Sequence, residues 1–186
     1  KVFVFAGSQW ELSAASGADT GGAVQWSGTV GAVWLFRPGL TLVGGFVFSE
    51  RLGYSTRYLP IAGFNWQIDD TWSLALTGSA ADYQAPVLKL AYALNPSTKL
   101  FAQVGFENGH LRLAGDSSIP HGYLRYEAFV PQIGADWRIS PGVELSVFTG
   151  AQLNQKYDFK NQARQYVYRE TADGAWVAGL RLNGRF

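Results

Sequence analysis

The stretch that decides the fold is the last one, Trp176-Val177-Ala178-Gly179-Leu180-Arg181-Leu182-Asn183-Gly184-Arg185-Phe186. Its side chains alternate between two kinds. One face carries Trp176, Ala178, Leu180, Leu182 and Phe186, and the other carries Val177, Gly179, Arg181, Asn183 and Arg185. Successive side chains of a β-strand point to opposite faces, so this stretch is predicted to be a strand between an apolar and a polar environment.

The same period of two recurs along most of the chain. It is clearest in 24–36, 40–48, 72–77 and 143–154, where apolar residues alternate with small or polar ones. No segment shows a convincing helical period. The alternation therefore predicts an all-β chain.

The connections between these runs come in two lengths. Short turns are expected at Arg37–Gly39, Asp69–Asp70, Asn95–Ser97 and Ser140–Gly142, where Pro, Gly, Asn, Asp and Ser gather. Longer polar connections are expected at 13–21, 50–57, 79–85, 114–121 and 158–164. Transmembrane β-barrels show this alternation, with short periplasmic turns and longer outer loops.

These boundaries predict one domain, residues 1–186, folded as a transmembrane antiparallel up-and-down β-barrel. Ten strands are expected, with eight or twelve as alternatives. The predicted strands are Val2–Leu12, Gly22–Phe36, Leu40–Ser49, Tyr58–Ile68, Thr71–Gly78, Pro86–Leu94, Lys99–Leu113, Gly122–Ile139, Val143–Phe159 and Gln165–Phe186.

The composition fits a protein with a large surface that does not face water. Aromatic residues make up 15% of the chain, 22 residues are Gly, and charged residues make up only 16%, against about 25% in typical globular domains. No apolar run is long enough for a transmembrane helix. Cys is absent, which excludes disulfides and thiolate metal sites, and a net charge of +1 gives no electrostatic case for nucleic acid.

Aromatic residues gather at the ends of the predicted strands. A soluble β-sandwich or a lipocalin-like barrel would also alternate, but rings at both ends of a span suit the two membrane interfaces. The location predicted is therefore the outer membrane of a Gram-negative bacterium. The predicted interface residues are Trp34, Phe36, Trp66, Trp72, Trp137, Trp176 and Phe186.

The last strand also resembles the C-terminal assembly signal of Gram-negative outer-membrane barrels, which ends in Phe or Trp. The resemblance implies recognition by the barrel-insertion machinery, and Gly184 departs from it where an apolar or aromatic residue is usual. The wider pattern is similar to a family of uncharacterised outer-membrane barrels over about the last two thirds of the chain. The segments that carry this similarity are Leu59–Trp66, Thr71–Leu74 and Ala85–Tyr92.

The predicted interior is polar and carries both signs of charge. A ten-strand barrel is barely wider than its own side chains, and unpaired buried charge costs several kcal/mol, so these groups should pair and plug the lumen. A wide porin is excluded, whereas a narrow path for ions or small solutes stays open. The predicted lumen network is Lys89, Glu107, Asp136, Arg138, Glu144, Arg181 and Arg185, with Gln103, Gln132, Gln152 and Asn183 also facing inward.

No catalytic, metal or cofactor site is predicted. His110 and His121 lie near Asp116 without metal-ligand spacing. Asp69-Asp70 lies in a short turn, which argues against the rim carboxylates of the omptin proteases. Ser117, Ser118 and His121 share one loop, and nothing orients them as a catalytic triad.

The sequence thus predicts a non-enzymatic barrel that acts as a structural, anchoring or interaction component of the cell envelope. The alternatives are a narrow channel for ions or small solutes and, second, an outer-leaflet lipid-modifying enzyme. The expected partners are outer-membrane lipids and lipopolysaccharide, the insertion machinery during assembly, and other envelope proteins through the outer hairpins.

Overall fold

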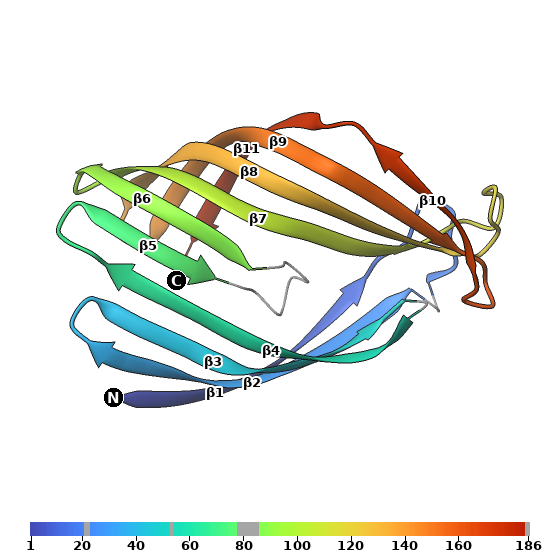
Figure 1. Cartoon of the computed structure of the whole chain (residues 1–186), viewed down its shortest axis with the longest axis horizontal. Helices are drawn as coiled ribbons and strands as arrows, with labels where there is room; N and C mark the ends of the chain where they lie inside the picture. The colour runs from blue at the N-terminus through green and yellow to red at the C-terminus, as the bar shows by residue number, and fades with distance from the viewer. Residues whose placement is uncertain (21–22, 53, 78–85, 185–186) are drawn as a thin grey trace.

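The computed structural model describes residues 1–20, 23–52, 54–77 and 86–184, which form one antiparallel sheet (Figure 1). No helix in these residues is long and apolar enough to cross a membrane. The eleven strands are β1 (Val2–Leu12), β2 (Val24–Arg37), β3 (Leu40–Arg51), β4 (Tyr54–Gln67), β5 (Trp72–Thr77), β6 (Val87–Asn95), β7 (Thr98–Arg112), β8 (Tyr123–Ser140), β9 (Val143–Lys160), β10 (Tyr166–Ala172) and β11 (Ala175–Gly184).

The topology is up-and-down, because each strand from β1 to β9 pairs with the next one along the chain. β10 and β11 both pair with β9, at successive levels of the same edge. The single tenth strand expected from Gln165 to Phe186 is therefore interrupted, and the strand count of ten is corrected to eleven. The sheet nevertheless has ten positions across its width, since β10 and β11 share one.

The interruption has a local cause in β9. Asn154 has a positive φ of 54°, and the β8–β9 register shifts between Glu127 and Phe129, which marks a β-bulge there. β10 follows β9 down to Gln155, and β11 begins opposite Gln152. Gln155 Nε2 donates to the carbonyl of Asp173 at 3.1 Å, in the two-residue break between the strands.

The four short turns lie at one end of the sheet (Figure 1). Gly39 and Gly142 occupy the left-handed region there, with φ of 77° and 92°. The Asp69 carboxylate accepts hydrogen bonds from the Thr71 and Trp72 amides at 2.7 and 2.8 Å, and these bonds lower its pKa. The predicted turn residues therefore do form these hairpins.

The sheet curls into two facing walls, β1–β4 and β6–β9, which converge at the end away from the short turns (Figure 1). Gly31 and Gly45 stand opposite each other in the first wall. A Cβ on Gly45 would lie 2.3 Å from the Val30 carbonyl oxygen, so the bend at this point requires glycine.

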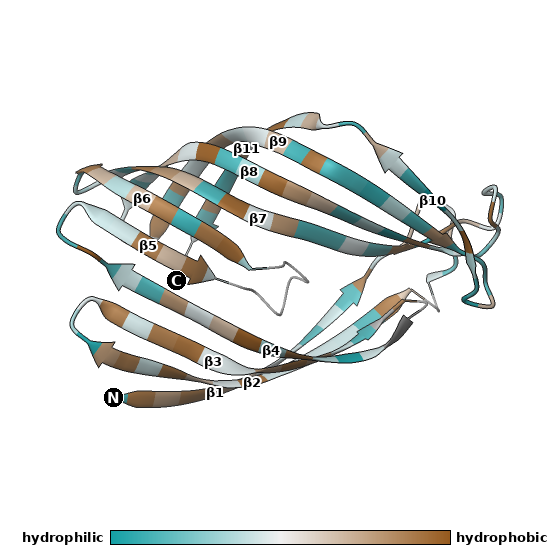
Figure 2. Cartoon of the chain, in the orientation of Figure 1, coloured by the Kyte–Doolittle hydropathy of each residue, from teal (hydrophilic) through white to brown (hydrophobic). Residues whose placement is uncertain are grey.

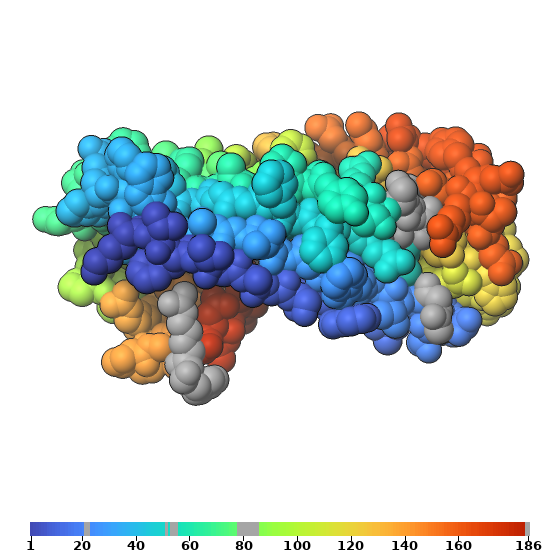
Figure 3. Space-filling model, turned by 90° about the horizontal axis from the view of Figure 1, so that it is seen from below, coloured from blue at the N-terminus to red at the C-terminus, as the bar shows by residue number. Residues whose placement is uncertain are grey.

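The expected closure of the barrel is not present in the described residues. Within the described residues, strand β1 pairs only with β2, and strands β10 and β11 pair only with β9, so the sheet keeps two edges. Figure 3 shows β1, in dark blue, along this open side with part of β11, in red, beyond it. The observed fold is thus an all-β antiparallel up-and-down sheet that curls without closing.

Several polar side chains are buried and many large apolar ones are exposed, which departs from the usual arrangement of a soluble domain. Gln25 and Ser27 are each 2% exposed, whereas Leu180 and Trp176 are 74% and 86% exposed. The alternating colours along the strands in Figure 2 reflect these two faces. We call the buried, concave face inward and the convex face outward.

Candidate functional site

The inward face of β6–β9 carries a set of paired polar side chains. Near the short-turn end, Lys89 Nζ lies 2.6 Å from Asp136 Oδ2, and Ser146 Oγ donates to Asp136 Oδ1 at 2.8 Å. Lys89 Nζ also lies 4.0 Å from the centre of the Phe101 ring. The buried Asp136 carboxylate is therefore held by one cation and one hydroxyl.

Two amide contacts continue this set toward the far end. Gln103 Nε2 donates to Gln132 Oε1 at 2.6 Å, and Gln152 Nε2 donates to Glu107 Oε2 at 2.8 Å. Each contact joins side chains from different strands, so the contacts act as rungs across the inside of the sheet. Together they fill this wall with hydrogen-bonded polar groups.

The other predicted lumen residues are arranged differently. Arg138 and Glu144 stand opposite each other on β8 and β9, at the exposed short-turn end. Arg181 lies on β11 with its guanidinium carbon 5.9 Å from the centre of the Phe148 ring. Asp136, in the same cross-strand row as Arg181 and Ser146, binds Lys89. Arg185 lies outside the described residues.

Most of the predicted interface aromatics lie outward near the short turns. Trp34 packs edge-on to Phe36 with ring centres 5.0 Å apart, and Trp72 packs against Tyr92 at 4.9 Å. Trp66 and Trp137 lie at the same end, on β4 and β8. Trp176 lies further from the turns, opposite Ala151, and Phe186 lies outside the described residues.

The outward face of β7–β9 is apolar over the same nine residues of each strand. The register aligns Thr98–Phe106 with Trp137–Phe129 and with Leu145–Leu153. The outward residues of this band, which we call the apolar band, are Thr98, Leu100, Ala102, Val104, Phe106, Phe129, Pro131, Ile133, Ala135, Trp137, Leu145, Val147, Thr149, Ala151 and Leu153.

The apolar band ends abruptly. The next row in the register is Asn108, Glu127 and Lys156, and the row beyond it is His110, Arg125 and Asp158, of which His110 and Asp158 are buried. The face therefore changes from uncharged to charged within two residues on β8 and three on β9, and from apolar to polar on β7. The part of β9 away from the short turns is accordingly mainly hydrophilic in Figure 2.

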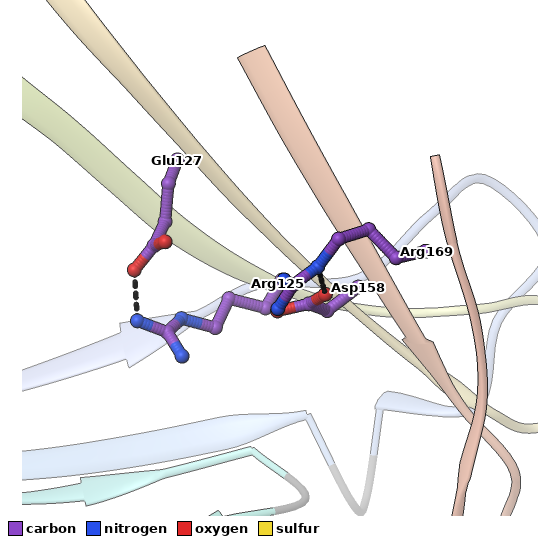
Figure 4. A network of polar contacts seen from close by, with 4 residues as sticks. All are labelled: Arg125, Glu127, Asp158 and Arg169. Carbon is purple, nitrogen blue, oxygen red and sulfur yellow. Dashed lines mark hydrogen bonds and ion pairs between the residues drawn. The ribbon is translucent and has the colours of Figure 1, made fainter. Parts of the chain in front are cut away.

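Ion pairs hold these charged rows together (Figure 4). Arg125 pairs with Glu127, and Arg169 Nε and Nη2 donate to the two carboxylate oxygens of Asp158 at 2.5 and 3.1 Å. The hydrogen bond from Arg169 lowers the pKa of the Asp158 carboxyl. The sequence prediction named neither pair. Asp158 fell where a predicted strand and a predicted loop overlap, and without a strand register it could not be matched to Arg169.

The residues considered for catalysis are engaged with the backbone or kept apart. Ser117 Oγ donates within its own turn, to the carbonyls of Ala114 or Ile119 at 2.8 and 2.9 Å. His121 lies in the same loop with a φ of 53°, and His110 lies on β7. No group of three or more His, Asp or Glu side chains that could hold a metal ion occurs in the described residues.

Comparisons with known proteins add no assignment: no family model, no curated protein and no solved structure matches the chain. The class of protein is therefore defined by the fold and its two faces alone. It is an antiparallel up-and-down β-sheet that is polar inside and apolar outside.

Proposed function

We propose that this protein is an integral outer-membrane β-barrel with a polar, largely plugged lumen, which serves the cell envelope as a structural, anchoring or interaction component. The observation that carries the proposal is the apolar band on β7–β9. Exposing so large an apolar surface to water is unfavourable, whereas in a membrane lipid chains would cover it.

The length of the band supports a membrane span. The band extends over nine consecutive residues of each strand, and a tilted transmembrane strand needs about 9–11. Nine residues at about 3.3 Å each, tilted by about 40°, cover a little over 20 Å, close to the apolar belt of about 25 Å on known barrels. The charged rows would then lie at the level of the lipid headgroups.

The interior supports a plug rather than a pore. The Lys89–Asp136 pair and the glutamine rungs occupy the inside of β6–β9. At the far end, the Ala15 amide donates to the Arg112 carbonyl at 2.9 Å, and the Arg112 amide donates to the Ser13 carbonyl at 3.1 Å. The connection after β1 therefore crosses to β7, which narrows the interior there.

A membrane-spanning barrel requires closure, and we propose that β1 pairs with β11. This closure would pair the free edges of β1 and β11, whose backbone groups lipid cannot satisfy, and would leave the edge of β10 free beyond the apolar band. The partners proposed for the closed barrel are outer-membrane lipids and lipopolysaccharide along the outward face, the insertion machinery through the last strand, and other envelope proteins at the hairpins beyond the charged rows.

Substitution inside and beyond the apolar band tests the proposal. Ile133 is 61% exposed at the middle of the band, so Ile133→Arg should destabilise the folded chain in lipid vesicles by about 2–4 kcal/mol. Thr171→Arg, on β10 opposite Lys156 and beyond the band, is the matched control and should change stability by under about 1 kcal/mol. The measurement is urea unfolding of the chain refolded into phosphatidylcholine vesicles.

Two results would contradict the membrane assignment. One is a wild-type chain that folds in buffer and does not associate with vesicles at all. The other is an equal, small effect of the two arginine substitutions, which would mean that the band does not contact lipid.

A further inference from the structure

A partly open pocket lies where the two walls converge, at the end of the interior away from the short turns. Its volume is about 240 Å³, roughly that of eight water molecules. We call it the outer pocket. Its lining residues are Glu11, Ser13, Gln25, Asn108, Gly109, His110, Leu111, Leu124 and Tyr126.

The outer pocket is built by segments about a hundred residues apart. The Ser13–Ala15 segment is fixed to Arg112 by two backbone hydrogen bonds, which bring the end of β1 against β7. Gln25 is buried, and its Oε1 accepts a hydrogen bond from the Leu52 amide at 3.3 Å. The Tyr126 ring lies over Gly109, where a Cβ would come within 2.1 Å of it. The lining is thus held from several directions.

The charge at this pocket is negative. Glu11 lines it, and Glu107 lies on the adjoining part of β7. Glu11 accepts a hydrogen bond from the Ser13 hydroxyl, and Glu107 accepts one from the Gln152 amide, so both carboxylates are held by neutral donors. Neither carboxylate forms an ion pair with a described residue, and no Lys or Arg lines the pocket.

The pKa of the Tyr126 hydroxyl reflects this negative charge. Tyr126 lies three residues beyond the apolar band, and its pKa is raised, first by burial and then by the Glu107 and Glu11 carboxylates. Tyr157 adds a smaller contribution of the same direction. All of these electrostatic influences favour a positive charge at the pocket.

We propose that the outer pocket binds a small organic ammonium ion. The carboxylate of Glu11 supplies charge, and the Tyr126 ring supplies an aromatic surface of the kind that attracts organic cations. The carboxamide oxygen of the buried Gln25, which also accepts from the Leu52 amide, adds an acceptor. The volume favours a molecule of several heavy atoms over a bare metal ion, for which the described residues offer no ligand cluster.

The test uses two probes of the same shape, choline and its uncharged analogue 3,3-dimethyl-1-butanol. The full chain, folded in detergent, is titrated with each by isothermal calorimetry. Choline should bind and the uncharged analogue should bind at least about tenfold more weakly, because only choline gains from the carboxylates. Glu11→Gln should raise the Kd for choline by about tenfold or more, and Tyr126→Leu should also raise it.

The matched control is Glu170→Gln, which removes the same charge from an exposed position on β10. It should leave the Kd for choline unchanged. Circular dichroism and thermal melting establish that each variant is folded before titration. The proposal is overturned if choline does not bind, if the two probes bind equally, or if Glu11→Gln and Glu170→Gln have the same effect. None of these outcomes depends on membrane insertion, so the proposed function stands or fails separately.

Discussion

At the scale of single residues, aromatic rings lie on glycines of the neighbouring strand. Five such pairs stand directly opposite each other in the register, with the glycine Cβ position within 2.1–2.6 Å of ring atoms. The pairs are Phe5 on Gly31, Phe48 on Gly28, Phe101 on Gly134, Tyr126 on Gly109 and Phe148 on Gly179. A glycine weakens a strand because it has no side chain to pack. The aromatic ring covers the backbone that the glycine leaves exposed.

Gly134 allows a sharp prediction, because it combines such a ring with a close backbone approach. A Cβ there would lie 2.3 Å from the Val147 carbonyl oxygen and 2.6 Å from the Phe101 ring. Gly134→Ala should therefore lower the free energy of unfolding by about 1–3 kcal/mol, the usual cost of overpacking. Urea unfolding of the chain in detergent or vesicles measures this change.

Gly44→Ala is the matched control, since no heavy atom lies within 4 Å of the Cβ position at Gly44. It should leave stability nearly unchanged. Equal effects of the two substitutions would mean that the ring and the carbonyl do not constrain Gly134.

At the scale of strands, local alternation predicted most of the elements and which face of each is polar. The four short turns were also predictable, because residues such as Gly39 and Asp69 form them from local geometry alone. The break between β10 and β11 was not, since it follows from the bulge at Asn154 in the neighbouring strand. The Asp158–Arg169 pair likewise depends on the register between β9 and β10, which residue pattern does not encode.

The registers also predict how β1 and β11 meet. Directly opposed residues lead from Val2 on β1 through every strand to Trp176 on β11, by way of Trp34, Leu42, Phe64, Leu76, Leu88, Val104, Pro131 and Ala151. In a closed barrel of ten strand positions tilted by 35–45°, the line of opposed residues returns to the first strand about 10–14 residues from where it began. We call this offset the stagger. The stagger must be even, so that apolar faces stay on one side.

With a stagger of about ten residues, the partner of Trp176 is Leu12, ten residues after Val2. A larger stagger would place this partner beyond the end of β1. Ser8 would then stand opposite Leu180. The chain has no cysteine, so cysteines introduced at Ser8 and Leu180 report this contact directly. We expect a disulfide within one chain of the vesicle-inserted protein, seen as a mobility shift on a non-reducing gel.

The paired control replaces Ser8 by its neighbour Gln9, whose side chain points to the opposite face of β1. Cysteines at Gln9 and Leu180 should not cross-link, and a pair at Trp10 and Leu180 would report a stagger two residues larger. Failure of every even-numbered partner on β1 to cross-link with Leu180 would rule out this closure.

At the scale of the whole molecule, the contact between Ser13–Ala15 and Arg112 is the least local feature of the fold. β6 pairs with β7 only as far as Leu88 and Val104, which leaves the far part of β7 without a β6 partner in the described residues. Ala14, in the connection after β1, forms an isolated parallel bridge with Arg112 in this part of β7. No pattern in the sequence indicates this contact, because it arises from the unequal lengths of strands far apart in the chain.

This contact and the polar rungs together determine whether ions can pass. Gln103–Gln132 and Lys89–Asp136 fill the inside of one wall, and the Ser13–Ala15 connection after β1 crosses the far end. The wild-type chain in planar bilayers should therefore show no steady unitary current. Ala15→Pro removes the amide that donates to Arg112 and should release the crossing, which raises the frequency of transient openings.

The control is Ala163→Pro, in the exposed β9–β10 connection. It introduces the same residue without touching the crossing and should show no current. Steady wild-type currents whose conductance changes in Arg181→Ala would instead identify a continuous path beside β11 and overturn the plugged interior.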